Sequence, residues 1–240
     1  MNEDTQTRPV EAVLFDLDGT LVDSEPVYWE SDRAFLAGFG IDYHGELNAA
    51  MVGRGSNEFF REMETLFPSS PLNSMSLAER SRRKDEAYLA HARGRLRSFP
   101  GVEAFARELR ARGIPAAIAS GSTPPVIDAT LDMLGLGDLF PVRVSGSEVP
   151  RGKPEPDVFL EAARRLGTPP AACLVLEDSE PGLMAARAAG MACVALPHPG
   201  HPRMGVFSGA RLVVTGGAAA FVPSLVFERW AFALKEAARG

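Results

Sequence analysis

From residue 102 onward, amphipathic stretches alternate with short apolar runs. The runs cover residues 116–119, 142–144, 172–176, 192–196 and 212–214, and we expect each to form a strand. Apolar residues at helical spacing predict helices over residues 102–112, 125–134, 156–166 and 182–189. Such alternation indicates a parallel sheet with helices on both faces.

One further apolar run, at residues 12–15, lies near the N-terminus and ends in Asp16-Leu17-Asp18-Gly19. An unbroken apolar run of this length is typical of a parallel strand buried on both faces. Open α/β sheets bind ligands at the carboxyl ends of their strands, and side chains two apart on an extended chain point the same way. Asp16 and Asp18 would therefore face one crevice, although a single Asp-x-Asp is equally typical of a polar exit from a strand.

Only helical periodicity is found between this first strand and residue 97. It predicts helices over residues 27–38, 45–51, 57–67 and 77–93, with a Pro- and Ser-containing loop at 68–76. Ser24 is the expected cap of the first of these helices, with Pro26 in its first turn. We therefore expect a Rossmann-like α/β core made of residues 10–24 and 98–240, and a small all-α cap domain, residues 25–97, inserted after the first strand.

The chain ends are expected to differ from each other. Residues 1–9 are polar and are expected to form a loose arm. Residues 223–238 are expected to be helical. The first nine residues do not resemble a signal or transit peptide, and the cytoplasm is therefore the expected compartment.

Composition narrows the classes of partner. The chain has 240 residues, 45% of them hydrophobic, which is enough for an ordinary core. A net charge of −6 argues against a nucleic-acid surface, and the densest basic run, residues 80–84, is expected to be a solvated helix face. The two cysteines, Cys173 and Cys193, lie in apolar runs and are expected to be inert core thiols. No apolar run is long enough to predict a membrane span.

Three polar clusters follow predicted strands downstream. Ser120-Gly121-Ser122-Thr123 offers hydroxyls and backbone N–H groups that suit an anion, or else a helix cap by Ser122 or Thr123. Lys153, in a loop rich in Gly and Pro, could place an ammonium group beside the paired acids, or lie on the surface. Glu177-Asp178 supplies hard oxygen ligands of the kind Mg²⁺ prefers, or complements a helix dipole.

Together these stretches resemble the haloacid dehalogenase superfamily of phosphohydrolases. Asp16-Leu17-Asp18-Gly19-Thr20 is similar to its first motif, Ser120 to its second, Lys153 to its third and Glu177-Asp178 to its fourth. The subgroup that this chain resembles contains β-phosphoglucomutase and small sugar-phosphate phosphatases, as the stretches at residues 22–25 and 152–157 indicate.

The resemblance implies a role for each motif residue. Asp16 would be the nucleophile that forms an aspartyl-phosphate, and Asp18 the general acid and then the general base. Ser120 and Lys153 would contact the phosphoryl oxygens, with further contacts from Leu17, Gly121 and Ser122. The implied cofactor is Mg²⁺, and its implied ligands are Asp16, the backbone carbonyl of Asp18, Glu177 and Asp178.

The cap is implied to select the substrate. Arg54 lies in the loop at residues 52–56 between two predicted cap helices, and is a candidate substrate contact or a solvated loop residue. Tyr28 stands where β-phosphoglucomutases usually carry a histidine, which disfavours a mutase. His198 and His201 lie in a Pro-rich stretch and are expected on a rim loop rather than at a metal.

The favoured function is therefore a Mg²⁺-dependent phosphatase of a small phosphorylated metabolite, a sugar or polyol phosphate, working as a monomer without nucleic acid or membrane. The alternatives are a hexose phosphate mutase of the β-phosphoglucomutase kind, a dehalogenase that uses Asp16 on carbon, and a sugar-phosphate-binding regulator without catalysis. The sequence does not select the phosphate ester.

Overall fold

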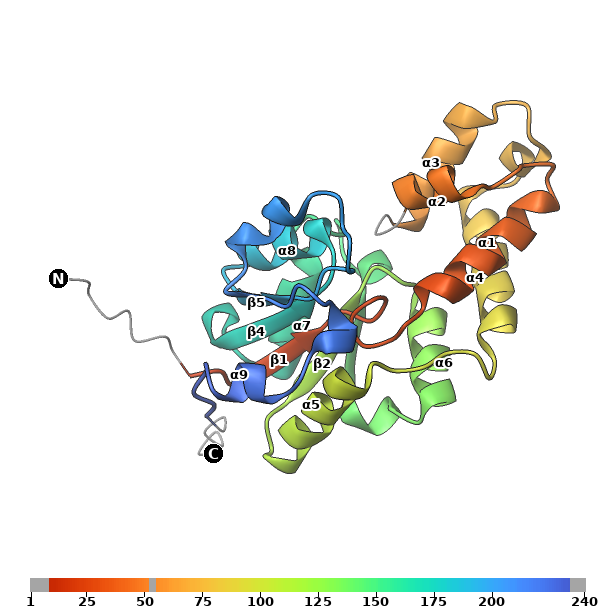
Figure 1. Ribbon diagram of the computed structural model, residues 1–240. Coiled ribbons are helices and arrows are strands. Elements are labelled where there is room, and N and C mark those ends of the chain that lie inside the picture. The colour runs from red at the N-terminus through yellow and green to blue at the C-terminus, as the bar shows by residue number, and fades with distance from the viewer. Residues whose placement is uncertain (1–8, 52–54, 234–240) are drawn as a thin grey trace.

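The computed structural model describes residues 9–51 and 55–233, and its centre is a parallel sheet (Figure 1). The strands are β1 (Ala12–Phe15), β2 (Ala116–Ser120), β3 (Val142–Ser145), β4 (Cys173–Glu177), β5 (Ala192–Ala195) and β6 (Leu212–Val213). They lie in the order β3-β2-β1-β4-β5-β6, and every neighbouring pair is parallel. The predicted α/β core is confirmed, and β1 lies between the strands that precede the second and fourth motifs.

Helices cover both faces of the sheet because the side chains of each strand alternate. Val13 and Phe15 of β1 belong to the apolar cluster formed with α5 (Pro100–Ala111) and α6 (Pro124–Leu134). Leu14 belongs to the cluster on the opposite face, formed with α7 (Asp157–Leu166) and α8 (Glu180–Ala188). All four residues of β1 are buried, as its unbroken apolar run predicts.

A helical segment lies to one side of the sheet (Figure 1). It contains α1 (Glu25–Ala37), α2 (Gly45–Met51), α3 (Ser56–Leu66) and α4 (Leu77–Ala92). It has an apolar cluster of its own, which includes Leu36, Tyr43, Phe59, Phe60 and Met63. None of the helices in the described ranges is long and apolar enough to cross a bilayer.

Two adjacent stretches of backbone join this helical segment to the sheet. Val22 and Ser98 form an antiparallel bridge. The N–H of Asp23 donates to the carbonyl of Arg97, and the N–H of Phe99 donates to the carbonyl of Leu21, both at 3.0 Å. The segment therefore leaves the core and returns to it at one place.

The C-terminal prediction was wrong within the described residues. The helix α9 covers only Ser224–Phe227, and Phe232 instead forms a parallel bridge with Val10. The backbone of Val10 accepts from Ala233 and donates to Ala231, while the ring of Phe232 packs against Phe227. Strand-like pairing and aromatic packing thus replaced the last helical turns, and residues 234–240 lie outside the described ranges.

The basic run at residues 80–84 was only half correctly predicted. Arg82 and Arg83 are exposed and pair with Glu79, but Arg80 and Lys84 are buried. Arg80 reaches Glu64 and Lys84 reaches Asp32 at 2.7 Å, so carboxylates inside the helical segment compensate both charges. The predicted loop at residues 68–76 also contains a 3₁₀ turn, Pro71–Ser74.

Candidate active site

Three carboxylates meet at the carboxyl edge of the sheet. Asp16 follows β1 directly, while Glu177 ends β4 and is followed by Asp178. The register places Phe15 opposite Leu176, and the N–H of Asp16 donates to the carbonyl of Leu176 at 3.0 Å. One oxygen from each of the three side chains lies within 4.8 Å of the others.

Lys153 joins this cluster from a loop more than a hundred residues away from Asp16 in sequence. Its Nζ lies 2.5 Å from Asp16 Oδ1 and 2.7 Å from Glu177 Oε2. The side chain of Lys153 is 11% exposed, so solvent screens these two contacts weakly. The sequence-based prediction that these stretches converge on Asp16 is therefore met by the geometry.

The cluster carries more negative charge than Lys153 can balance. Burial raises the pKa of Asp16, the charge of Glu177 adds to this effect, and Lys153 opposes it. Burial and the charges of Glu177 and Asp16 likewise raise the pKa of Asp178 well above its usual range. Carboxylates held this close with one ammonium group favour a hard cation among them, and three oxygen donors fit Mg²⁺.

Asp18 accepts hydrogen bonds from two hydroxyl groups. Ser24 donates to its Oδ1 at 2.7 Å, and Ser122 donates to its Oδ2 at 2.6 Å. Burial raises the pKa of Asp18, while the two hydroxyl donors oppose that shift. Ser24 is the N-cap residue of α1, as predicted, but its side chain makes no capping hydrogen bond and its hydroxyl donates to Asp18.

Two glycines make room for the acids. Gly19 has φ +79°, and a Cβ there would lie 2.3 Å from Asp178 Oδ2, while the neighbouring Thr20 donates to Asp178 Oδ1 at 3.1 Å. At Gly182, in α8, a Cβ would lie 1.9 Å from Glu177 Cδ. The hydroxyl and the backbone N–H of Ser179 donate to Glu177 Oε1.

We expect Gly182→Ala to lower activity by about a hundredfold or more and stability by roughly 1–3 kcal/mol, because the added methyl group displaces the Glu177 carboxylate from Lys153 and Ser179. Activity assays and urea denaturation measure the two effects. Gly205→Ala is the control, since nothing lies within 4 Å of its Cβ. Equal activity of the two variants would contradict this account of Gly182.

A family model described as haloacid dehalogenase-like hydrolase matches residues 10–190. This chain belongs to the haloacid dehalogenase-like hydrolases.

Relatives of this hydrolase fall in the subgroup that the motifs indicate. It is 33% identical over 184 residues to fructose-1-phosphate phosphatase YqaB of Escherichia coli, covering 76% of this chain and 94% of that protein. It is 35% identical over 190 residues, 77% of this chain, to a bifunctional riboflavin kinase/FMN phosphatase of Arabidopsis thaliana, but spans only 48% of that longer protein. A crystal structure of CbbY from Rhodobacter sphaeroides with phosphate superposes with a TM-score of 0.78 at 28% identity, covering 88% of this chain and 95% of that one.

The remaining predicted site residues of this hydrolase are placed as follows. Ser120 ends β2 and is buried, with its hydroxyl accepting from the N–H of Ser122 at 3.0 Å. Leu17 is buried and Gly121 is exposed. Arg54 lies outside the described residues, so the structure does not place it. His198 is exposed, as expected of a residue on a rim loop.

Sequence reasoning missed several polar contacts of the site. Tyr28 entered only as a departure from the family pattern, yet its hydroxyl lies 3.1 Å from that of Ser122. Thr123 caps no backbone group of α6 and donates instead to Asp85 of α4 at 2.6 Å. Tyr28 and Asp85 lie on helices, and the sequence does not show which side of each helix faces the site. A helical wheel of α1 is the one signal that could have indicated Tyr28.

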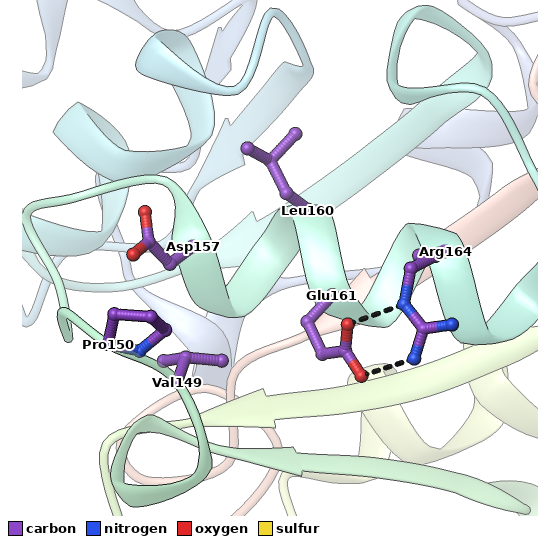
Figure 2. Close-up of a pocket in the computed structure, with 6 residues that line it drawn as sticks. All are labelled: Val149, Pro150, Asp157, Leu160, Glu161 and Arg164. Atoms are coloured by element: carbon purple, nitrogen blue, oxygen red, sulfur yellow. Dashed lines mark hydrogen bonds and ion pairs between the residues drawn. The ribbon is translucent and has the colours of Figure 1, made fainter.

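A hollow of the surface lies apart from the carboxylate cluster. It is lined by Val149, Pro150, Asp157, Leu160, Glu161 and Arg164, none of which belongs to the carboxylate cluster (Figure 2). Within it Glu161 and Arg164 pair with each other, and Asp157 pairs with Arg151. Because its charges are compensated, this hollow does not compete with the carboxylate cluster as the candidate active site.

Proposed function

We propose that this hydrolase is a Mg²⁺-dependent phosphatase that acts on a small phosphorylated metabolite, a sugar or polyol phosphate, through an aspartyl-phosphate on Asp16. One observation carries the proposal. The carboxylate of Asp16 contacts an ammonium group at 2.5 Å, lies beside two further acids, and is followed two residues later by an acid that accepts from two hydroxyl groups. This set supplies a nucleophile, charge compensation and a proton donor.

The residues divide the reaction between them. An oxygen of Asp16 attacks phosphorus, the bond from phosphorus to the leaving alcohol breaks, and Asp18 gives that alcohol its proton. Asp18 then takes a proton from water, whose oxygen attacks phosphorus, and Asp16 leaves as a carboxylate. Lys153 and Ser120 hold the phosphoryl oxygens, since phosphoryl transfer depends chiefly on positioning and charge compensation.

Asp16, Glu177, Asp178 and the backbone carbonyl of Asp18 would hold the Mg²⁺. When bound, the ion neutralises the carboxylates against the incoming phosphate dianion. The raised pKa values of Asp16 and Asp178 support this assignment, because burial and then the charge of Glu177 disfavour both carboxylates in the protein alone, and a bound cation offsets both effects.

We propose that residues 25–97 form the cap that closes over the site and selects the alcohol. The separate apolar cluster, to which α1, α2 and α3 contribute, and the adjacent entry and exit of the segment support this division. The name of the relative YqaB, a fructose-1-phosphate phosphatase, supports a sugar phosphate as the class of substrate. A monomeric state and a cytoplasmic location stay predictions.

Release of inorganic phosphate from a panel of sugar and polyol phosphates tests the proposal. We expect release with Mg²⁺ and its loss, by at least about a hundredfold, when a chelator removes the ion, with activity returning when Mg²⁺ is restored. Isomerisation of a hexose phosphate with negligible release of phosphate would establish the mutase instead. Equal rates with and without the chelator would contradict the metal assignment.

A further inference from the structure

Three hydroxyl groups and one carboxylate form a continuous chain beside the candidate nucleophile. Ser122 donates its only hydroxyl proton to Asp18 Oδ2 at 2.6 Å. The hydroxyl of Tyr28 lies 3.1 Å from Ser122 Oγ, and because Ser122 has already used its proton, Tyr28 is the donor in that bond. Ser24 donates to the other oxygen of Asp18 at 2.7 Å.

Tyr28 is held firmly in this position. Its ring stacks on that of Tyr88, with centroids 4.0 Å apart and planes 17° apart, and Tyr88 is fully buried. The ammonium group of Lys84 lies 4.9 Å from the centroid of the Tyr28 ring. Burial and the nearby charge of Asp18 raise the pKa of Tyr28, so its hydroxyl stays a donor over the working range of pH.

We infer that Tyr28 is a positioning residue that acts through Ser122 to fix the orientation of the Asp18 carboxyl group. The inference rests on the proposed function, in which Asp18 gives the leaving alcohol its proton. Hydrogen-bonded chains strengthen each member by polarisation, so the Tyr28 hydroxyl strengthens the bond from Ser122 to Asp18. A carboxyl group held on both oxygens has one orientation, and small errors in that orientation are costly in catalysis.

This series of hydrogen-bonded side chains links the helical segment to the sheet. Tyr28 lies in α1, whereas Ser122 lies in the loop after β2, next to Ser120 and Gly121. The orientation of Asp18 therefore depends on a residue of the helical segment that has no hydrogen bond to Asp18 itself.

The adjacent residue of the same loop provides a matched control. Thr123 donates to Asp85 of α4 at 2.6 Å, so it also links the loop to the helical segment. No contact between Thr123 and Asp18 occurs among the hydrogen bonds of the described residues. Thr123→Val therefore loosens the same junction without touching the chain of hydroxyls.

The experiment measures kcat/KM of each variant with the same two substrates. An alkyl phosphate, such as a polyol phosphate, needs a proton on its leaving oxygen, whereas p-nitrophenyl phosphate does not. We expect Tyr28→Phe to lower kcat/KM about tenfold for the alkyl phosphate and less than about twofold for p-nitrophenyl phosphate, a part of the 10²–10⁴-fold that general acid catalysis contributes. Ser122→Ala should give a larger loss with the same preference.

Thr123→Val should change kcat/KM for both substrates by the same factor, because it acts only on the junction between the loop after β2 and the helical segment. The inference is overturned if Tyr28→Phe lowers kcat/KM equally for both substrates, or leaves kcat/KM for the alkyl phosphate unchanged. If Tyr28→Phe does not fold, Ser122→Ala decides, and an equal loss for both substrates overturns the inference there too. Failure of the proposed function would look different, since the wild-type protein would then release phosphate from neither substrate.

Discussion

Asp16→Asn is expected to release phosphate on the order of 10⁴-fold more slowly than the wild-type protein, and to take up no covalent phosphate. An amide at this position cannot form the acyl-phosphate bond, although it is close in size to the carboxylate and keeps an oxygen near Lys153. Rapid acid quenching with a ³²P-labelled substrate, followed by counting of precipitated protein, measures the intermediate.

The control for Asp16→Asn is Asp23→Asn. Asp23 is exposed, and its backbone N–H bonds to Arg97 at the base of the helical segment. This variant should keep wild-type labelling and turnover. Equal labelling of wild type and Asp16→Asn would remove Asp16 as the nucleophile and leave the carboxylate cluster with a metal-binding role alone.

Lys153→Met is expected to be the most destabilising change in the site when Mg²⁺ is absent. It leaves Asp16 and Glu177, which are 8% and 1% exposed, without their cation, and breaking a buried pair in this way costs about 3–5 kcal/mol. Urea denaturation measures this cost. Added Mg²⁺ should stabilise the variant more than the wild-type protein, because the ion then meets less competition for the same oxygens. Activity should fall by roughly 10²–10³-fold even with Mg²⁺.

Arg151→Met separates this effect from the loss of any basic residue in the loop. Arg151 pairs with Asp157 and Glu155, and its side chain is 61% exposed, so removing it should leave the urea midpoint close to that of the wild-type protein. Equal stability of the two variants without Mg²⁺ would show that Lys153 does not compensate the acids in solution.

The convergence of the candidate site residues was predictable from the sequence because most of them lie at strand ends. Asp16, Ser120 and Glu177 each end or follow an apolar run, and parallel strands bring those ends to one edge whatever the loops do. The position of Lys153 was harder to predict, because Lys153 does not directly follow a strand. Its place was indicated by the order of the motifs, and the structure brings it to Asp16.

The errors have a common physical origin in tertiary contacts. Lys84 lies in a run of basic residues that is typical of a solvated face, yet Asp32 of α1 compensates it inside the helical segment. Ser24 is the N-cap residue of α1, yet its side chain makes no capping bond, and its hydroxyl donates to Asp18. The C-terminal helix ended early because Phe232 pairs beside Val10. Local patterns do not contain these partners.

The paired crossing at Val22 and Ser98 has an evolutionary consequence. Because the chain departs and comes back through neighbouring peptide groups, everything between them can be lengthened, shortened or replaced without disturbing the order of the sheet. Selection can thus alter the helical segment while the carboxylates at the sheet edge are inherited unchanged. The loop beyond β2, which contacts α1 and α4 through side-chain hydroxyls, obliges both parts to change together.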